Sequence, residues 1–289
     1  MIPVLDIGGT HVTAALVEPA ADEPVRARRR RPLDAQAGAR EILAAITGCA
    51  AGLAAPPGAV WGVSVPGPFD YERGVGRFAG VGKFEALRGV DVGAALRAGL
   101  PGPPGGVVFR NDAECFLLGE WRAGAARGLP RCVGITLGTG VGSAFLGEGR
   151  MHHEGPGVPP EGRVDLLRPG GRPLEDSVSR RAILAAYGEP GVDVHTIAER
   201  ARAGQARARR VLDEAFGALG TVLGPRLAAF GATGLVVGGS MAQSWDLVGP
   251  ALRAGLGDTA VRVLPASLGA DAPLIGAAHV ATSRAPATG

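Results

Sequence analysis

The sequence has few cysteines and no long apolar run, and both shortages narrow the possible classes of protein. Three cysteines lie far apart among 289 residues, at Cys49, Cys115 and Cys132. Neither a disulfide framework nor a paired zinc motif is therefore expected. The sequence shows no charged-then-apolar leader, and no apolar stretch of about 18 residues is free of charge. We expect a cytoplasmic protein with no membrane contact.

Aromatic residues are also scarce, at 4% of the chain, and none interrupts the basic run from Arg26 to Arg31. A nucleic-acid surface usually combines basic and stacking side chains, and no helix-turn-helix pattern precedes this run. The first apolar segment already begins at residue 2, so we expect no DNA-binding domain before it. The run predicts a solvated, charged strand or loop and no nucleic-acid partner.

The remaining composition is that of a folded protein. Hydrophobic residues make up 46% and charged residues 20% of the chain, with a net charge of +3. The 48 glycines and 23 prolines lie between apolar runs and form no low-complexity block. A chain of this length can form two domains with substantial cores.

The first segment, from Ile2 to Val17, predicts a hairpin of two buried strands. The tight turn between them is Gly8–Thr10, where glycines let backbone N–H groups approach an anion and the threonine adds a hydroxyl. Asp6 ends the first strand, and a carboxylate there needs a partner, for which Mg²⁺ with its water shell is suitable. An ordinary hairpin with a capping aspartate remains an alternative.

A second hairpin, from Cys132 to Phe145, repeats this pattern about 130 residues later. Its turn is Gly138–Thr139–Gly140, and a matched pair of such turns indicates an internal duplication with one phosphate cradle in each half. A third glycine segment, Gly238–Gly239, follows the short strand Leu235–Val237. It is suited to hold a nucleotide against the backbone at the start of a helix.

Between these turns, helical and strand patterns alternate, which is typical of an α/β protein. The segment 107–110 predicts a strand that delivers Asn111 and Asp112 at its carboxyl end, where open α/β sheets place their chemistry. The helix expected after it makes a helix N-cap the favoured role for Asp112 on the residues alone. Further elements are predicted as helices at 34–55, 92–100, 113–126, 174–187, 195–203, 206–230 and 272–281, and as strands at 59–65 and 261–264.

Together these segments resemble the ROK family (repressors, open reading frames, kinases), a branch of the actin-like ATPases that includes bacterial glucokinases. The matching segments are DIGGT at 6–10, GVSVPGP at 62–68, NDAE at 111–114, LGTGVGS at 137–143, VVGGS at 236–240 and LIGAA at 274–278. The resemblance implies two ribonuclease-H-like α/β domains with a cleft between them. We expect the smaller domain to comprise residues 1–112 with the C-terminal helix 271–289, and the larger one residues 113–270.

The resemblance also implies roles for individual residues. Asp112 would be the general base for a sugar hydroxyl, and this implication reverses the preference for a simple cap. Asp6 would hold Mg²⁺, through water. The sugar would be bound by Asn111, Glu161, Glu175 and Gly67. The phosphates and adenosine of ATP would be held by Gly8, Gly9, Thr10, Gly138, Thr139, Gly140, Gly238 and Gly239.

One segment departs from the family pattern. The family's GxAGEIGH segment aligns with residues 157–164, where Glu161 keeps the glutamate but Val164 replaces the histidine that helps to bind a structural zinc ion. The family's cysteine segment is absent, although Glu175 matches its last glutamate. We therefore expect no zinc site, and we expect His152 and His153 to be exposed loop residues.

The resemblance predicts an ATP-dependent kinase of a hexose, with glucose favoured because Lys83-Phe84 resembles the sugar-side loop of glucokinases. Kinases of N-acetylmannosamine or fructose are alternatives within the same class. A sugar-sensing or nucleotide-sensing protein with little catalysis is an alternative from another class. The family and the small residues of the C-terminal helix also suggest a homodimer.

Overall fold

The computed structural model describes residues 1–284 of the chain. Residues 285–289, which end the predicted first domain, lie outside the described part. Contacts divide the chain into two compact units: Met1–Arg122 together with the segment that begins at Ala270, and Ala123–Gly269. The predicted domain boundaries at 112 and 270 stay a prediction. In residues 1–284, no helix is long and apolar enough to cross a membrane.

The first unit is built on a five-stranded sheet in the order β3-β2-β1-β4-β7. The strands β1 and β2 form the predicted antiparallel hairpin, and β4 and β7 extend the sheet in parallel to β1. The elements of this unit are β1 (Ile2–Ile7), β2 (His11–Val17), β3 (Val25–Pro32), α1 (Ala39–Ala50), β4 (Val60–Val65), β5 (Phe69–Asp70), β6 (Val75–Gly76), α2 (Val92–Gly99), β7 (Gly106–Asn111), α3 (Asp112–Ala123) and α9 (Ala272–Arg284).

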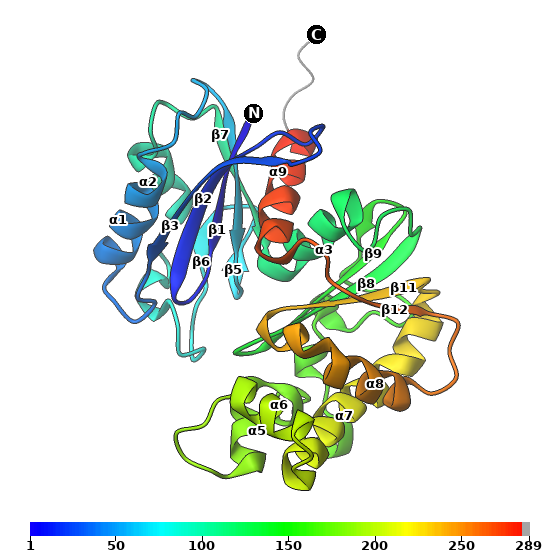
Figure 1. Ribbon diagram of the computed structural model, residues 1–289. Helices are drawn as coiled ribbons and strands as arrows, with labels where there is room; N and C mark the ends of the chain where they lie inside the picture. The colour runs from blue at the N-terminus through cyan, green and yellow to red at the C-terminus, as the bar shows by residue number, and fades with distance from the viewer. Residues whose placement is uncertain (285–289) are drawn as a thin grey trace. The chain divides into compact units, whose positions relative to one another are not determined.

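The basic run at Arg26–Arg31 forms most of β3, one of the two edge strands of this sheet (Figure 1). This confirms the prediction of a charged strand. Most of its residues are exposed to solvent. Charged side chains on an edge strand discourage pairing with a second chain.

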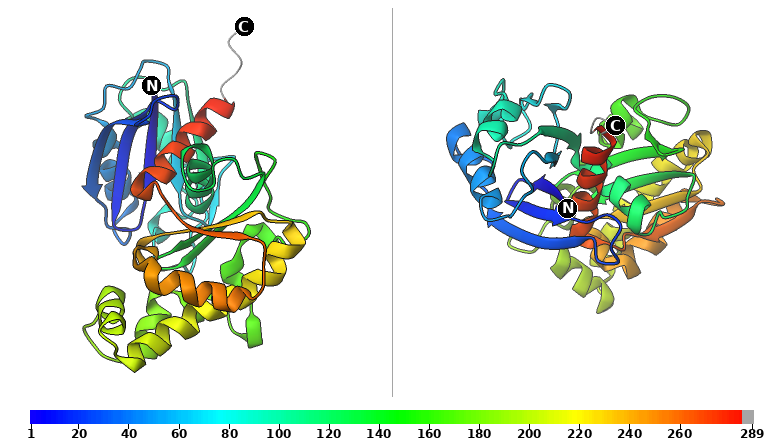
Figure 2. Two further views of the ribbon diagram at one scale, coloured as in Figure 1. Left: turned by 45° about the vertical axis from the view of Figure 1, so that its right-hand side comes forward. Right: turned by 90° about the horizontal axis from the view of Figure 1, so that it is seen from above.

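The C-terminal helix α9 packs on the face of the first sheet opposite α1 and α2 (Figures 1 and 2). Its small residues let the backbones approach closely: a Cβ added to Gly62 would collide with the carbonyl of Ala277, and one added to Gly276 with that of Cys115. The small residues of this helix are thus used in packing within the chain. The homodimer stays a prediction.

The second unit repeats the sheet pattern, with the order β10-β9-β8-β11-β12. Again an antiparallel hairpin, β8 and β9, is followed by parallel strands, as the internal duplication predicts. Its elements are β8 (Arg131–Leu137), β9 (Val141–Gly147), β10 (Arg150–Met151), α4 (Glu175–Val178), α5 (Arg180–Tyr187), α6 (Val194–Arg202), α7 (Ala206–Phe230), β11 (Gly234–Gly238), α8 (Trp245–Leu256) and β12 (Arg262–Pro265).

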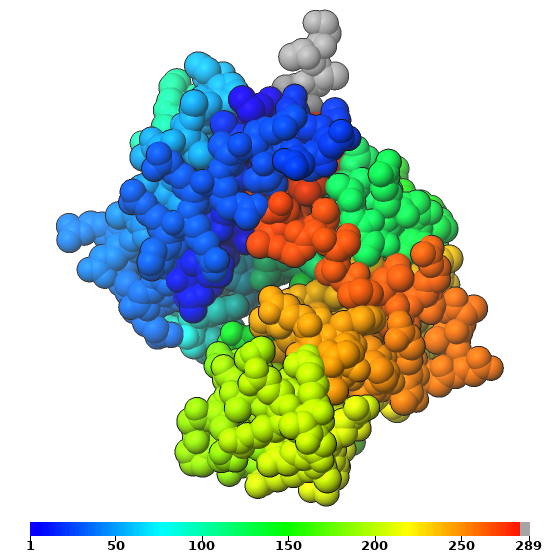
Figure 3. Space-filling model, in the orientation of Figure 1, coloured from blue at the N-terminus to red at the C-terminus, as the bar shows by residue number. Residues whose placement is uncertain are grey.

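The long helix α7 carries much of the core of this unit, with Leu219, Leu223 and Leu227 fully buried. The helices α5 and α6 contact α7 and lie in the yellow-green surface in Figure 3. The helix segment predicted directly after Gly239 begins as a short 3₁₀ turn, Ser240–Ser244, before α8.

Candidate active site

In the first unit, a row of polar residues crosses the whole sheet on one face. Arg30 pairs with Thr13, Thr13 with Asp6, Asp6 with Ser64, and Ser64 with Arg110 in the strand registers. Directly paired residues share a face of a sheet. The helix α9 covers the neighbouring positions on this face. The polar residues of this row are therefore not explained by a surface that is open to water.

Asp6 lies at the centre of this row and is partly buried. Its Oδ1 accepts a hydrogen bond from Ser64 Oγ at 2.7 Å. Burial raises the pKa of Asp6 to about 6, and the negative charge of Asp112 adds to this effect, whereas the Ser64 hydrogen bond and Arg30 oppose it. A cation beside Asp6 would favour its ionised form.

The first glycine turn, Gly8–Thr10, follows directly. The Gly8 N–H donates to the carbonyl of His11 at 2.9 Å, which closes the hairpin. In residues 1–284, neither the Gly9 nor the Thr10 N–H has a hydrogen-bond acceptor. Two adjacent backbone donors without acceptors form a suitable site for an anion.

His11 flanks this turn, and its Nδ1 lies 3.0 Å from Thr10 Oγ1. Burial, together with the positive charge of Arg30, lowers the pKa of His11, so the ring is neutral at pH 7. It therefore contributes a hydrogen bond to the turn rather than a charge.

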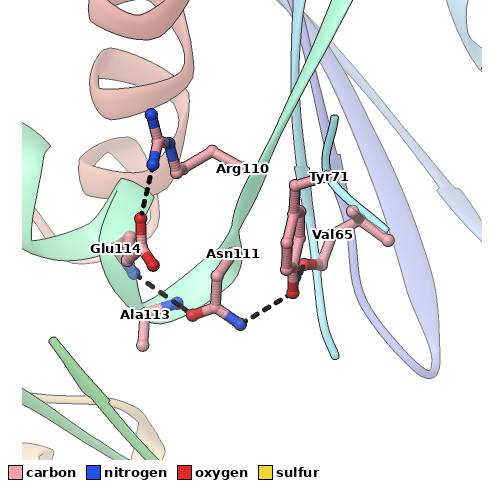
Figure 4. Close-up of polar contacts among 6 residues, drawn as sticks. All are labelled: Val65, Tyr71, Arg110, Asn111, Ala113 and Glu114. Atoms are coloured by element: carbon pink, nitrogen blue, oxygen red, sulfur yellow. Dashed lines mark hydrogen bonds and ion pairs between the residues drawn. The ribbon is translucent and has the colours of Figure 1, made fainter. Parts of the chain in front are cut away.

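Asn111, rather than Asp112, provides the main cap of helix α3. Asn111 Oδ1 accepts from the N–H groups of Ala113 at 2.9 Å and Glu114 at 3.3 Å (Figure 4). Asp112 Oδ1 accepts only from Ala113, also at 2.9 Å. Since Asn111 accepts from two N–H groups at the helix terminus, most of the hydrogen-bonding capacity of the Asp112 carboxylate remains available for another group.

Asp112 is partly buried at the start of α3 and makes no ion pair with another side chain in the described part of the chain. Burial raises its pKa, while the positive charge of Lys83 and the Ala113 N–H lower it. A carboxylate with a raised pKa is a better proton acceptor than an exposed aspartate.

Asn111 also joins the loop that follows β4. Its Nδ2 donates to the hydroxyl of Tyr71 at 3.0 Å, and this hydroxyl donates to the carbonyl of Val65 at 3.4 Å (Figure 4). The space above Gly67 is bounded by the same hydroxyl and by Asn111 Nδ2. The structure thus brings the predicted sugar residues Asn111 and Gly67 together, and it adds Tyr71, which no motif in the sequence identified.

The second unit holds the other predicted residues. In the second glycine turn, Gly138–Gly140, the Gly138 N–H donates to the carbonyl of Gly140 at 3.0 Å, and the N–H groups of Thr139 and Gly140 have no acceptor within residues 1–284. The two glycine turns therefore share the same pattern of donors. This similarity supports the predicted pair of phosphate cradles.

Gly239 lies directly against the second glycine turn. It has a positive φ of 89°, and a Cβ there would collide with the backbone of Leu137. The hydroxyl of Ser240 lies 4.0 Å from the position of a Cβ on Gly138. The strand ends that carry Gly138 and Gly238 thus meet at one edge of the second sheet, as parallel neighbours must.

The acceptor loop, residues 157–167, shows how the segment that departs from the family pattern is held. Ser143 Oγ on β9 donates to the carbonyl of Gly162 at 2.6 Å and accepts from the Val164 N–H at 3.0 Å. Val164 is fully buried in the core. An apolar residue and a serine hydroxyl thus fix the loop at the place where the family pattern has histidine.

The two predicted sugar carboxylates lie near one arginine in this loop. Arg163 forms an ion pair with Asp165 at 2.6 Å, and its pKa is raised by that pair and then by the negative charges of Glu161 and Glu175. Glu161 has a positive φ of 58°, and the Glu175 carboxylate lies against Gly140. Glu175 is therefore beside the second glycine turn as well as the acceptor loop.

The prediction that His152 is exposed was wrong. Its ring is half-buried, with its centre 5.5 Å from that of Phe230, because β10 turns it onto the end of α7. His153 is exposed as expected. Among the described residues, no cluster of three or more His, Cys, Asp or Glu side chains could hold a metal ion.

The sequence profile described as "ROK family" matches residues 3–284, almost the whole chain. The chain belongs to the ROK family. Among solved structures, the ROK hexokinase from Thermus thermophilus superimposes with a TM-score of 0.76 at 27% identity, covering 98% of each chain. The α/β fold of this ROK protein is accordingly the actin-like ATPase fold, as predicted.

Two curated relatives extend the similarity. This ROK protein is 30% identical over 298 residues to the bifunctional enzyme NanE/NanK of Brucella melitensis, covering 97% of this chain. It spans only 54% of that enzyme's length, about half. It is 26% identical to the glucokinase of Thermotoga maritima over 77% of this chain and 79% of that protein. A sugar kinase is the class that these similarities support.

Proposed function

We propose that this protein transfers the γ-phosphoryl group of ATP to a hydroxyl group of a hexose, with glucose as the favoured acceptor and glucose 6-phosphate as the product. The observation that carries the proposal is Asp112. It is a partly buried carboxylate that leaves the main cap of α3 to Asn111, and it lies on the same unit as a glycine turn with unused N–H donors.

The residues present fit Mg·ATP in their chemistry. The N–H groups of Gly9, Thr10, Thr139 and Gly140 lack acceptors within the described residues, as donors meant for phosphate oxygens would. Asp6 uses Oδ1 for Ser64 and retains Oδ2 for a water molecule of the Mg²⁺ shell. Gly238 and Gly239 would leave room for the adenosine beside the second glycine turn.

When bound, Mg·ATP supplies the phosphoryl group and part of the neutralising charge. Asp112 accepts the proton of the sugar hydroxyl as its oxygen bonds to the γ-phosphorus, while the bond from that phosphorus to the bridging oxygen breaks and ADP leaves with the electron pair. General-base help of this kind contributes about 10²–10⁴-fold to rate. The backbone donors of both turns stabilise the charge on the transferring group.

For the sugar, Asn111 and the carboxylates of Glu161 and Glu175 are the proposed ligands, with Gly67 and Tyr71 closing the space beside Asn111. Glucose is favoured by the resemblance at Lys83-Phe84 and by the similarity to a protein named glucokinase. Val164 and Arg163 distinguish this acceptor loop from the family pattern, so the test compares several hexoses.

The test is a coupled assay of ADP release with Mg·ATP and five sugars: glucose, mannose, fructose, N-acetylglucosamine and N-acetylmannosamine. We expect turnover on glucose. Asp112→Asn should reduce this turnover at least ~10²-fold, while the variant still binds ATP and the sugar. If the protein phosphorylates only another of these sugars, that sugar replaces glucose as the proposed acceptor. Binding without turnover on any sugar would favour a sensor over an enzyme.

A further inference from the structure

Lys83 is the sole lysine in a chain with 30 basic lysine and arginine side chains. It lies in the first unit, in the segment that joins β6 to the short 3₁₀ helix Glu85–Leu87. All the other basic side chains in that total are arginines, and most surface ion pairs among the described residues use one of them, an exception being His195–Glu199. A single lysine in such a chain suggests a task that a compact ammonium group performs and a guanidinium does not.

The backbone around Lys83 is firmly held, although the segment has no regular secondary structure. The next residue, Phe84, is fully buried, and its N–H donates to the carbonyl of Ala35 at 2.8 Å. On the preceding side, Glu85 Oε1 accepts from the N–H groups of Val81 at 2.8 Å and Gly82 at 3.1 Å. Lys83 thus projects from an anchored loop.

From this anchor, the side chain of Lys83 extends over the first glycine turn. Its Cδ lies 3.9 Å from the position that a Cβ of Gly9 would take, and no other group comes within 4 Å of that position. The aliphatic part of Lys83 therefore covers the turn whose N–H donors lack acceptors. The ammonium group at its end carries the positive charge beside these donors.

The same ammonium group acts on the proposed base. The positive charge of Lys83 is the strongest charge effect on Asp112. In the described residues, Lys83 nevertheless forms no ion pair within 4 Å, either with Asp112 or with another carboxylate. Lys83 is therefore close to the turn and to the base, and its hydrogen-bond donors remain available for a third group.

We propose that Lys83 Nζ binds the terminal phosphoryl group of the nucleotide and neutralises its charge during transfer. This inference rests on the proposed function, and it gives Lys83 a catalytic role, whereas the family resemblance had linked the Lys83-Phe84 segment only to the choice of sugar. Lys83 takes no part in the proton transfer. The γ-phosphoryl oxygens carry charge that ADP lacks at that position, so Lys83 should distinguish ATP from ADP.

A single lysine makes a direct test possible. Reductive methylation with ¹³C-formaldehyde retains the charge of amines and labels only Lys83 and the terminal amine. The nuclear magnetic resonance signal that disappears in Lys83→Met belongs to Lys83. We expect Mg·AMPPNP to shift this signal and Mg·ADP to leave it almost unchanged. Equal shifts with both nucleotides, or none with AMPPNP although it binds, would overturn the inference.

Measurements of affinity and turnover on the unlabelled protein give a second, independent test of the role of Lys83. We expect Lys83→Met to weaken AMPPNP binding about 10-fold and to leave ADP binding within about twofold. We expect kcat to fall about 10²-fold, with the KM for sugar and the melting temperature unchanged, and Lys83→Arg to restore part of kcat. Arg88→Met, which removes an exposed cation from the same region, is the matched control and should change none of these values.

The outcomes separate the two proposals. If the wild-type protein binds neither nucleotide, the proposed function itself fails. If it binds both and Lys83→Met loses turnover without losing its preference for AMPPNP, Lys83 acts only on Asp112 and the phosphate role is wrong.

Discussion

Ser64 donates a hydrogen bond to Asp6 from the directly opposite position on the neighbouring parallel strand, and the two oxygens lie 2.7 Å apart. This is the single hydrogen bond that supports the Asp6 side chain within the described residues. The hydrogen bond lowers the pKa of Asp6 by less than burial raises it, so the pKa still lies at about 6. Near pH 6, the carboxylate at the centre of the first sheet is therefore present in both its charged and its neutral form.

The first prediction concerns stability and Asp6. Since the folded-state pKa of Asp6 lies above its unfolded value of 3.8, folding favours the protonated form. That contribution is complete below pH 4 and is lost as pH rises through about 6. Without metal or nucleotide, we expect Asp6→Asn to be more stable than wild type by ~1–3 kcal/mol at pH 7.5.

Urea unfolding at pH 4.5 and pH 7.5 in a chelating buffer measures this difference. The advantage of Asp6→Asn should shrink at the lower pH, where wild-type Asp6 is largely protonated. An advantage of the same size at both pH values would contradict the predicted pKa. In assays, the same variant should lose most of its Mg²⁺-dependent turnover.

The second prediction concerns the pH dependence of turnover. Asp112 must be ionised to accept a proton, and its pKa is raised by burial. We therefore expect kcat/KM for sugar to fall on the acid side at a pH above the usual range of an exposed aspartate. A profile of kcat/KM from pH 4 to pH 9 tests this, and a rate that stays level down to pH 4 would exclude Asp112 as the base.

The third prediction concerns the acceptor loop. Ser143 bridges the backbone on both sides of Arg163, and Glu161, directly before the bridged Gly162, has a strained positive φ. Removing the hydroxyl in Ser143→Ala releases both contacts and the fixed position of Glu161. We expect the KM for sugar to rise about 10-fold, while nucleotide affinity stays within about twofold.

Thr221→Ala is the control for this prediction, because Thr221 donates a similar hydrogen bond to Gly217 on the exposed side of α7. It should leave the KM for sugar unchanged. An equal loss of nucleotide affinity in Ser143→Ala would indicate a general disturbance of the second unit instead of a role in placing Glu161.

The fourth prediction separates two glycines of similar backbone conformation. Gly239 and Gly257 both have positive φ, but only at Gly239 does a Cβ meet the backbone, that of Leu137. We expect Gly257→Ala to cost ~1 kcal/mol from strain alone, and Gly239→Ala to cost at least ~2 kcal/mol. Thermal unfolding measures both, and similar losses would show that the contact with Leu137 is not constrained.

Local patterns in the sequence predicted the elements that lie beside the site. Both hairpins, their glycine turns and the strand that delivers Asn111 and Asp112 follow from short apolar runs and turn chemistry, which neighbouring residues determine. The roles of Asn111 and Asp112 in capping could not be separated in this way, because adjacent residues compete for the same N–H groups. Only the backbone geometry at the start of α3 assigns the main cap to Asn111.

Contacts between distant segments could not be predicted. Lys83 lies 74 positions from Gly9, and Ser143 lies 21 positions from Val164, so no local periodicity connects either pair. The exposure of His152 was wrongly predicted for the same reason, because the ring of Phe230 that covers it comes from the end of α7.

The position of α9 has a consequence for biosynthesis. The helix covers the sheet that carries Asp6, yet the ribosome makes it after every strand and helix of the second unit. During translation the second unit can complete its core from a continuous stretch of chain, whereas the first sheet must wait with its α9 face uncovered. The half of the protein that is begun first is therefore finished last.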